Sequence, residues 1–221
     1  TPLTSLRTNM ELLIAASRPG APSLPPEDMA ELREDVVGQI EELSTLVGDL
    51  VDLAREDAPE AVFEAVDIAE VVDRSLERAR RRRTDVVFTA VTEPWYVFSD
   101  HAALTRAMVN VLDNAAKWSP AGAEVFVRMR QIGPGLMEIT VDDAGPGIPE
   151  EERELVFERF YRATSARSMP GSGLGLAIVR QIVMKHGGTI AVDRSERGGA
   201  LIRIVLPGTP DLGDDAGTDR A

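Results

Sequence analysis

Cysteine is absent from this chain of 221 residues. Its absence excludes disulfide bonds, thiolate nucleophiles and cysteine-based zinc sites, and it fits a reducing compartment. The chain also lacks any apolar run near the roughly 20 residues that a membrane-spanning helix needs, and we expect no signal peptide within it. Histidine is scarce too, because His101 and His186 are the only two. We expect both histidines to be structural.

Positive charge is in the minority. The formal net charge is −13, which repels the phosphates of nucleic acids, so a general role in binding DNA or RNA is not expected. The basic exception is the run of arginines at 78 and 80–83. Such cations are stabilising at the solvated C-terminal end of a helix, and a docking patch for a membrane or partner is the alternative. Hydrophobic residues make up 43% of the chain, which permits a sizeable core.

Apolar residues recur every three or four positions over residues 1–18 and again over about 27–56, which predicts two amphipathic helices. A proline-rich loop separates them. We therefore expect a helical hairpin over residues 1–57 and a short linker over 58–62. A lone hairpin cannot cover both apolar stripes, so we expect it to pair with a second copy as half of a dimeric four-helix bundle. Packing of the hairpin on its own globular domain is the alternative.

From residue 63 the pattern alternates between strand and helix, which predicts an α+β domain over 63–208. A polar tail without fixed structure is expected over 209–221. We predict helices at 67–82, 101–118 and 174–186, with Asp100 capping the second helix and Gly187 ending the third. The predicted strands lie at 63–66, 86–91, 95–98, 125–132, 136–141, 189–193 and 200–206.

Three polar residues fall on one face of the predicted helix 101–118. Asn110, Asn114 and Lys117 occupy positions i, i+4 and i+7, so their side chains project together. Amide oxygens suit a hard cation such as Mg²⁺, and an ammonium group suits phosphate. The stripe therefore fits a magnesium polyphosphate, although an exposed polar helix face explains the same spacing equally well.

A glycine-rich turn follows the apolar strand 136–141, with the sequence Asp143-Ala-Gly145-Pro-Gly147. A carboxylate at a strand end can accept a hydrogen bond from an exocyclic amine such as that of adenine. The glycines allow the backbone to approach a flat base closely. A plain tight turn is the alternative.

A second glycine-rich turn, Gly171-Ser-Gly173-Leu-Gly175, opens the predicted helix 174–186. Free amides and the helix dipole make such a turn an anion site. The dinucleotide interpretation fails because no strand enters the turn, and the P-loop interpretation fails because no Gly-Lys-Ser/Thr follows. Between the two turns, Phe157 and Phe160 either anchor one end of a mobile lid or belong to the core.

In this order, the Asn-bearing helix, Asp-x-Gly-x-Gly, the Phe pair and Gly-x-Gly-x-Gly resemble the N, G1, F and G2 boxes of the histidine kinase catalytic domain. Gyrase, the Hsp90 chaperones and the MutL mismatch-repair proteins belong to the same wider ATPase group. The resemblance spans roughly Asp67 to Pro207 and includes every box. It implies a two-layer α/β sandwich with a mixed sheet, the Bergerat-type ATP-binding fold, and the cofactors ATP and Mg²⁺.

The resemblance also implies roles for individual residues. Asn110 would coordinate Mg²⁺, Asn114 and Lys117 would contact the nucleotide phosphates, and Asp143 would read the adenine amine. The other implied nucleotide-binding residues are Gly145 and Gly147 at the base, Gly171, Gly173 and Gly175 on the phosphate side, and Arg159 or Arg162 at the γ-phosphate.

The first seven residues, Thr1-Pro-Leu-Thr-Ser-Leu-Arg7, resemble the end of the motif His-Glu/Asp-Leu-Arg-Thr-Pro-Leu around the phospho-acceptor of sensor histidine kinases. Thr1 would lie four residues after that histidine, which the chain begins too late to include. In that family this threonine helps to position water for dephosphorylating a response regulator. We therefore expect this chain to bind Mg-ATP without autophosphorylating and its parent to be both kinase and phosphatase.

The resemblance thus predicts the cytoplasmic kinase core of a two-component sensor, anchored in the inner or plasma membrane only through segments upstream of Thr1. Its partners would be the receiver domain of a response regulator and a second copy bound through residues 1–57. A GHKL-type serine kinase or anti-sigma factor is a rival that lacks the helical hairpin. A non-catalytic ATP-binding interaction module is a rival of another class. A chaperone or mismatch-repair ATPase would need a further transducer domain.

Overall fold

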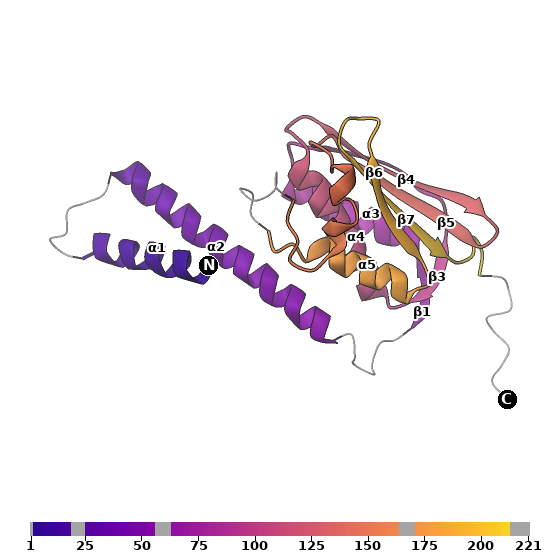
Figure 1. Ribbon diagram of the computed structural model, residues 1–221, viewed down its shortest axis with the longest axis horizontal. Helices are drawn as coiled ribbons and strands as arrows, with labels where there is room; N and C mark the ends of the chain where they lie inside the picture. The colour runs from indigo at the N-terminus through magenta and orange to yellow at the C-terminus, as the bar shows by residue number, and fades with distance from the viewer. Residues whose placement is uncertain (1, 19–24, 56–62, 164–170, 213–221) are drawn as a thin grey trace. The chain divides into compact units, whose positions relative to one another are not determined.

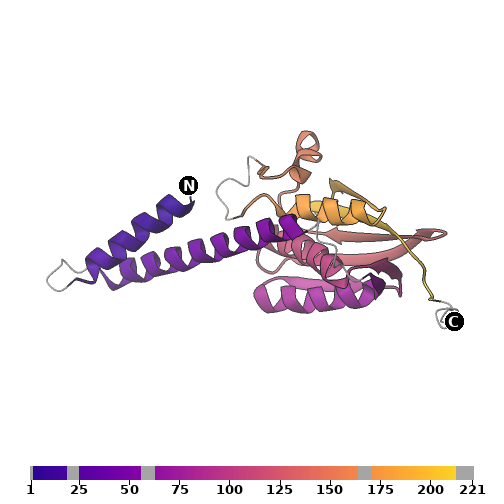
Figure 2. The same cartoon turned by 90° about the horizontal axis from the view of Figure 1, so that it is seen from below.

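The computed structural model describes residues 2–18, 25–55, 63–163 and 171–212, which form a helical hairpin and an α+β unit (Figure 1). The hairpin consists of α1 (Pro2–Ala16) and α2 (Pro26–Arg55), and α1 lies alongside the first part of α2 (Figure 2). Glu27 and Asp28 occupy the first turn of α2, where negative charge stabilises the helix dipole. The predicted linker 58–62 lies outside the described residues.

Part of the apolar stripe of α2 is exposed among the described residues. Val36 is buried, whereas Ile40 is 48% exposed and Val47, one heptad further, is 58% exposed. Covering such a row of apolar side chains with another surface removes apolar area from water, which is favourable. The hairpin therefore leaves described residues of this stripe exposed to water.

The α+β unit is built on a mixed five-stranded sheet in the order β2-β4-β5-β7-β6. The pair β2–β4 is parallel and the other three pairs are antiparallel. The strands are β2 (Val87–Val91), β4 (Glu124–Gly133), β5 (Leu136–Asp142), β7 (Ala200–Pro207) and β6 (Thr189–Arg194).

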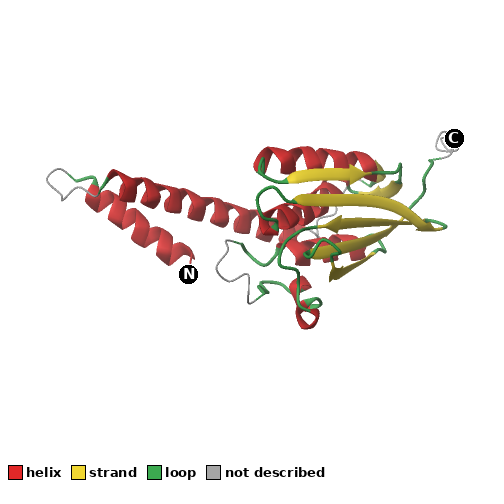
Figure 3. Ribbon diagram, turned by 90° about the horizontal axis from the view of Figure 1, so that it is seen from above, coloured by secondary structure: helices red, strands yellow, loops and turns green. Residues whose placement is uncertain are grey.

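Helices α3 (Ile68–Arg82), α4 (His101–Trp118) and α5 (Gly175–Lys185) cover one face of this sheet (Figure 3). The side chain of Asp100 accepts a hydrogen bond of 2.8 Å from the amide of Ala102, which confirms the predicted cap of α4. Gly187 has φ 69° and follows the end of α5, as the sequence predicted. Across the described residues, the predicted helices and strands are present and their ends differ by no more than two residues.

The core lies between the helices and the inner face of the sheet. Along β4 the side chains of Val125, Val127 and Met129 are buried, while the alternate residues Phe126 and Arg128 face outward. This period of two gives the sheet one apolar and one polar face. The result is a two-layer α/β sandwich, as predicted. No helix among the described residues combines the length and hydropathy that crossing a membrane requires.

A small antiparallel ribbon of β1 (Glu64–Asp67) and β3 (Tyr96–Ser99) lies outside the main sheet. Thr209, which the sequence placed in the polar tail, exchanges two main-chain hydrogen bonds of 2.8 and 3.0 Å with Tyr96. Regular main-chain pairing therefore extends to Thr209, one residue into the predicted tail. The polar composition of the tail did not reveal this, because the order of Thr209 comes from its main-chain hydrogen bonds to Tyr96.

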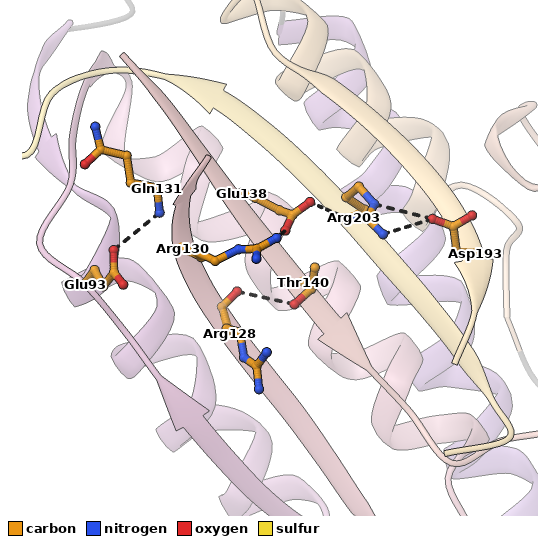
Figure 4. A network of polar contacts seen from close by, with 8 residues as sticks. All are labelled: Glu93, Arg128, Arg130, Gln131, Glu138, Thr140, Asp193 and Arg203. Carbon is orange, nitrogen blue, oxygen red and sulfur yellow. Dashed lines mark hydrogen bonds and ion pairs between the residues drawn. The ribbon is translucent and has the colours of Figure 1, made fainter. Parts of the chain in front are cut away.

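The outer face of the sheet carries a chain of ion pairs (Figure 4). Glu138 on β5 lies between Arg130, at 3.0 Å, and Arg203, which in turn reaches Asp193 at 3.3 Å. The Glu138 side chain is only 10% exposed. Burial alone would raise its pKa, but the hydrogen bonds and charges of Arg203 and Arg130 outweigh burial and leave the pKa below the ordinary value. The pairs thus join β4, β5, β7 and β6 across the strands.

We predict that Glu138→Gln lowers the free energy of unfolding by about 1–2 kcal/mol at pH 7, because two arginines lose a charged acceptor. A depressed carboxyl pKa contributes stability above the unfolded value and loses it as the pH falls through the folded value. The difference between the two proteins should therefore shrink as the pH falls below 4.5, the ordinary value for this group.

Urea titrations at pH 7 and at acidic pH measure this difference. The matched control is Glu93→Gln, since Glu93 is exposed and accepts one hydrogen bond of 3.3 Å from the amide of Gln131, which an amide oxygen can still accept. A loss at position 138 no larger than at position 93 would contradict the prediction.

Candidate functional site

Helix α4 carries the polar stripe that the sequence singled out, and the structure places α5 beside it. A side chain at Gly175, the first residue of α5, would lie 3.8 Å from Oδ1 of Asn110. The side-chain nitrogen Nδ2 of Asn110 is buried and has no hydrogen-bond partner among the described residues. A buried polar atom without a partner is costly unless a ligand or ion satisfies it. Asn110 therefore has the environment of a ligand-binding group.

The last turn of α4 carries Asn114 and Lys117, and Trp118 interacts with both. Its indole Nε1 donates a hydrogen bond of 3.2 Å to Oδ1 of Asn114, and the Lys117 ammonium lies 5.3 Å from the centre of its ring. Trp118 thus contacts both residues of the predicted phosphate-binding pair. Trp118 is a site residue that no sequence pattern identified, although it directly follows Lys117.

Asp143 ends β5 in a position that is only 3% exposed. Its Oδ1 accepts hydrogen bonds of 2.9 Å from the amides of Gly145 and Ala200. Its Oδ2 accepts none from the part of the chain that the structure describes. Burial raises the pKa of Asp143, the two amides partly offset this, and the charge of Asp142 raises it further. The turn therefore holds a buried carboxylate whose hydrogen bonds to the protein are both made by Oδ1.

The Asp143 turn packs against the end of α4. A Cβ at Gly145 would lie 2.9 Å from Cβ and 3.0 Å from the carbonyl oxygen of Trp118. The Ser119 hydroxyl accepts a hydrogen bond of 3.4 Å from the amide of Ala144. Only glycine fits at position 145 at this distance, which explains the first glycine of the Asp-x-Gly-x-Gly pattern.

Gly199 is a site residue that sequence reasoning missed. A Cβ there would collide with the carboxylate and main chain of Asp143, and Gly147 would be 3.1 Å from the carbonyl oxygen of Gly199 if it had a side chain. Gly147 also has φ 76°, a conformation that favours glycine. The doublet Gly198-Gly199 before the last strand was the available signal, but a hairpin turn explains such a doublet equally well.

The two aromatic residues between the turns have different environments. Phe157 is buried, whereas Phe160 is 60% exposed and has φ 64°, the one positive φ of a non-glycine residue among the described residues. The core interpretation is therefore wrong for Phe160. Its amide donates a hydrogen bond of 3.1 Å to the carbonyl of Gly173, and a Cβ at Gly173 would lie 2.8 Å from its carbonyl carbon. This contact joins the Phe segment to the second glycine-rich turn.

The remaining predicted residues are less closely grouped. Arg159 is exposed and donates a hydrogen bond of 3.3 Å to Gln181, well past the start of α5, and Arg162 is half-buried. Gly171 has φ 145°, which also favours glycine. Thr1 lies outside the described residues.

The two histidines have local partners. In His186, Nδ1 donates a hydrogen bond of 2.7 Å to the carbonyl of Ile182, and the Ser99 hydroxyl lies 2.6 Å from Nε2. The Nδ1 atom of His101 lies 3.5 Å from the hydroxyl of Thr105, on the same helix. Such contacts fit the structural role predicted for both histidines.

The described residues of this site offer few oxygens to a magnesium ion, so phosphates of a bound nucleotide would have to provide others. Among the described residues no group of three or more His, Cys, Asp or Glu side chains is arranged to bind a metal. Mg²⁺ in proteins commonly takes one or two protein oxygens together with substrate phosphates and waters. Rotating the Asn110 amide about χ2 exchanges its two atoms and would put its oxygen at the position that has no partner. The residues present therefore fit a magnesium ion that arrives with a polyphosphate.

Residues 99–210 match the family described as histidine kinase-, DNA gyrase B- and HSP90-like ATPase. This match covers about half of the chain and includes α4, the Asp143 turn, the Phe pair and the second glycine-rich turn. The chain belongs to this family.

The relatives narrow the class to sensor histidine kinases. The chain is 60% identical over 225 residues to the signal transduction histidine-protein kinase/phosphatase MprB of Mycolicibacterium vanbaalenii, covering 100% of this chain and 46% of that protein. A solved mycobacterial sensor histidine kinase MprB aligns at 59% identity with a TM-score of 0.65, over 67% of this chain and 100% of that one. The resemblance to sensor histidine kinases is thereby confirmed.

A more distant structure shares the fold alone. The Acinetobacter baumannii histidine kinase AdeS is 23% identical with a TM-score of 0.67, over 94% of this chain and 95% of that one. The chain spans somewhat under half the length of the curated relatives it matches.

We predict that Asp143→Asn raises the free energy of unfolding by about 1 kcal/mol at pH 7, or about 2–4 °C in Tm. Asparagine keeps an Oδ1 acceptor for both amides and removes the buried charge. Because the pKa of Asp143 is raised, its charge is a penalty above the folded value that disappears below the unfolded value of 3.8.

Wild type should therefore approach the stability of the variant as the pH is lowered. Thermal unfolding of both proteins across the acidic range measures this. A variant that is less stable than wild type at pH 7 would show that the negative charge itself stabilises the turn.

Proposed function

We propose that the α+β unit binds Mg-ATP and transfers the γ-phosphoryl group to a histidine, which passes it to an aspartate on a response regulator. The observation that carries this proposal is the meeting of three segments that are distant in sequence. Asn110 lies beside Gly175, and the turn of Asp143 packs on Trp118 at the end of the same helix. The names of the relatives support the histidine as acceptor.

In this proposal each segment has one task. The Oδ2 atom of Asp143 accepts a hydrogen bond from the adenine amine, and the amides at the start of α5 together with its dipole hold phosphate oxygens. Asn114 and Lys117 bind the polyphosphate, and Asn110 provides an oxygen for Mg²⁺, which neutralises phosphate charge when bound. Phosphoryl transfer depends chiefly on such positioning and charge neutralisation. Arg159 or Arg162 would stabilise the γ-phosphate.

The nucleophile in this reaction is a histidine ring nitrogen. It forms the new bond to the γ-phosphorus, the bond from phosphorus to the β,γ-bridging oxygen breaks, and ADP leaves. Both histidines of this chain lie in the ATP-binding unit and have the local contacts described above. We therefore expect this chain to act on a histidine outside its own 221 residues.

We propose further that the hairpin pairs with a second copy through residues 1–57. The exposed row of Val37, Ile40 and Val47 on α2 supports this, because pairing would remove it from water. Sedimentation that reports only monomers at all accessible concentrations would contradict it. A membrane-anchored parent with a cytoplasmic catalytic part remains the proposal that the sensor-kinase relatives support.

ATP binding and transfer of a labelled phosphoryl group test the proposed function directly. The chain should bind ATP more tightly with Mg²⁺ than without, and it should retain no acid-labile label from γ-labelled ATP. A separate hairpin with the sequence His-Glu/Asp-Leu-Arg should become labelled. Asp143→Asn should weaken ATP binding by about 10–100-fold while the fold stays intact, since a donor then faces the adenine amine.

Calorimetry and gel autoradiography measure these outcomes. Acid-stable label on a serine would favour a serine kinase, and tight binding without any transfer would favour a non-catalytic ATP-binding module. Stable phosphohistidine on the chain itself would contradict the assignment of its two histidines.

For Thr1 we propose a role in dephosphorylating the response regulator, supported by the kinase/phosphatase names of the relatives. In the full-length parent, Thr1→Ala should slow loss of phosphate from a labelled regulator and leave phosphoryl transfer to the histidine nearly unchanged. Following both reactions with the same preparations gives the comparison. A variant that keeps the phosphatase activity and loses only the kinase activity would refute this role.

A further inference from the structure

The guanidinium of Arg83 contacts the end of α4 from the neighbouring helix. Arg83 is the C-cap residue of α3, and its Nη1 donates a hydrogen bond of 2.6 Å to the carbonyl of Ala116. Its Nη2 donates one of 3.3 Å to the carbonyl of Ser119, just past the helix end. The last carbonyls of a helix have no partner within the helix and carry partial negative charge. The guanidinium therefore satisfies and stabilises this helix terminus.

Asp85 fixes the guanidinium from the other side. Nε and Nη2 of Arg83 donate hydrogen bonds of 2.8 and 3.1 Å to the two carboxylate oxygens of Asp85. The main-chain carbonyl of Asp85 accepts a further hydrogen bond of 2.6 Å from the amide of Gly122, in the loop after α4. A planar guanidinium with five donors can make its four hydrogen bonds to Asp85, Ala116 and Ser119 at once, and an ammonium with three donors cannot.

The end of α4 that Arg83 contacts is the place where two parts of the nucleotide site meet. The last turn of α4 carries Asn114 and Lys117. The hydroxyl of Ser119, which is buried, accepts the hydrogen bond from Ala144 in the Asp143 turn. A shift of the residues 118–119 would therefore move the phosphate-binding and the adenine-binding groups together.

We propose that Arg83 is a positioning residue of the nucleotide site, holding the end of α4 in register with the Asp143 turn through the carbonyl oxygens of Ala116 and Ser119. This inference rests on the proposed function for its effect on binding, but the contact itself is independent of any ligand. The neighbouring arginines make other contacts, and one of these is also on α4. Arg82 pairs with Asp113 at 2.7 Å, and Arg80 donates a hydrogen bond of 2.9 Å to the carbonyl of Phe88 on β2.

Arg80→Gln is the matched control for Arg83→Gln. Both changes remove an arginine of the basic run that bonds to a main-chain carbonyl, but Arg80 faces β2 and not the end of α4. We expect Arg83→Gln to weaken Mg-ATP binding on the order of tenfold, because small displacements of ligand-positioning groups are costly. Arg80→Gln should change it less than twofold. Arg83→Lys should recover part of the affinity, since an ammonium can still reach one of the two carbonyls.

Titration calorimetry well below the unfolding temperature of every variant measures the affinities. Amide hydrogen exchange of Ala144 without nucleotide, followed by NMR, reports the hydrogen bond that joins the end of α4 to the Asp143 turn. We expect faster exchange at Ala144 in Arg83→Gln and an unchanged rate in Arg80→Gln. If Arg83→Gln does not fold, Asp85→Asn takes its place, because it removes the carboxylate that orients the guanidinium and leaves both carbonyls available. It should then show the same pattern with smaller changes.

The two measurements separate the possible failures. If wild type does not bind Mg-ATP, the proposed function fails, and the exchange of Ala144 still tests the role of Arg83. If wild type binds but the Arg83 variants bind equally well, or Arg80→Gln weakens binding as much as Arg83→Gln, the positioning role is overturned. Exchange of Ala144 at the wild-type rate in Arg83→Gln overturns it as well.

Discussion

The buried carboxylate of Asp143 is the constraint on which the site depends. Its Oδ1 accepts hydrogen bonds from the main-chain amides of Gly145 and Ala200. One oxygen therefore fixes the shape of a turn and joins the end of β5 to the start of β7. Burying a charge is tolerable only when hydrogen bonds replace the water it loses. Gly145 and Gly199 lie directly against this carboxylate, because a Cβ at either position would come within 3.1 Å of Oδ1. The other oxygen is left for a ligand.

Helix α4 connects this constraint to the rest of the unit. Its apolar face, which includes Leu104, Val111 and Leu112, is buried in the core. The polar stripe on its other side is half-buried, since the start of α5 lies beside Asn110 and the Asp143 turn packs on the helix end. The sheet contributes rigidity from the opposite face, where ion pairs join neighbouring strands (Figure 4). The polar stripe of α4 therefore lies at one side of the apolar core, where a ligand could reach it.

Features with local causes could be predicted from the sequence. Periodicity and turn chemistry gave the helices and strands, and Asp100 was identified as a cap because a cap acts within three residues. The order of the glycine-rich turns indicated the ATPase family, which the family match confirmed. Contacts across long separations could not be predicted. Asp143 and Ala200 are 57 positions apart, and no local pattern announces that Gly199 must lack a side chain. The sequence left Phe160 open between a lid anchor and the core, because its exposure and its φ of 64° depend on the contact with Gly173.

The arginines at the end of α3 illustrate why charge patterns underdetermine function. Solvated cations at a helix end would be enough to explain this basic run in the sequence. In the structure, however, Arg80 and Arg83 donate hydrogen bonds to carbonyl oxygens of other elements, and Arg82 pairs with a carboxylate on α4. Bonding to main-chain oxygens has a physical consequence that bonding to side chains lacks. The side chains of Asn114 and Lys117 can change rotamer, so the part of the site that the protein can hold fixed is the helix that carries them. A guanidinium on the carbonyls of residues 116 and 119 restrains that helix directly, and its own orientation is set by a carboxylate two residues away.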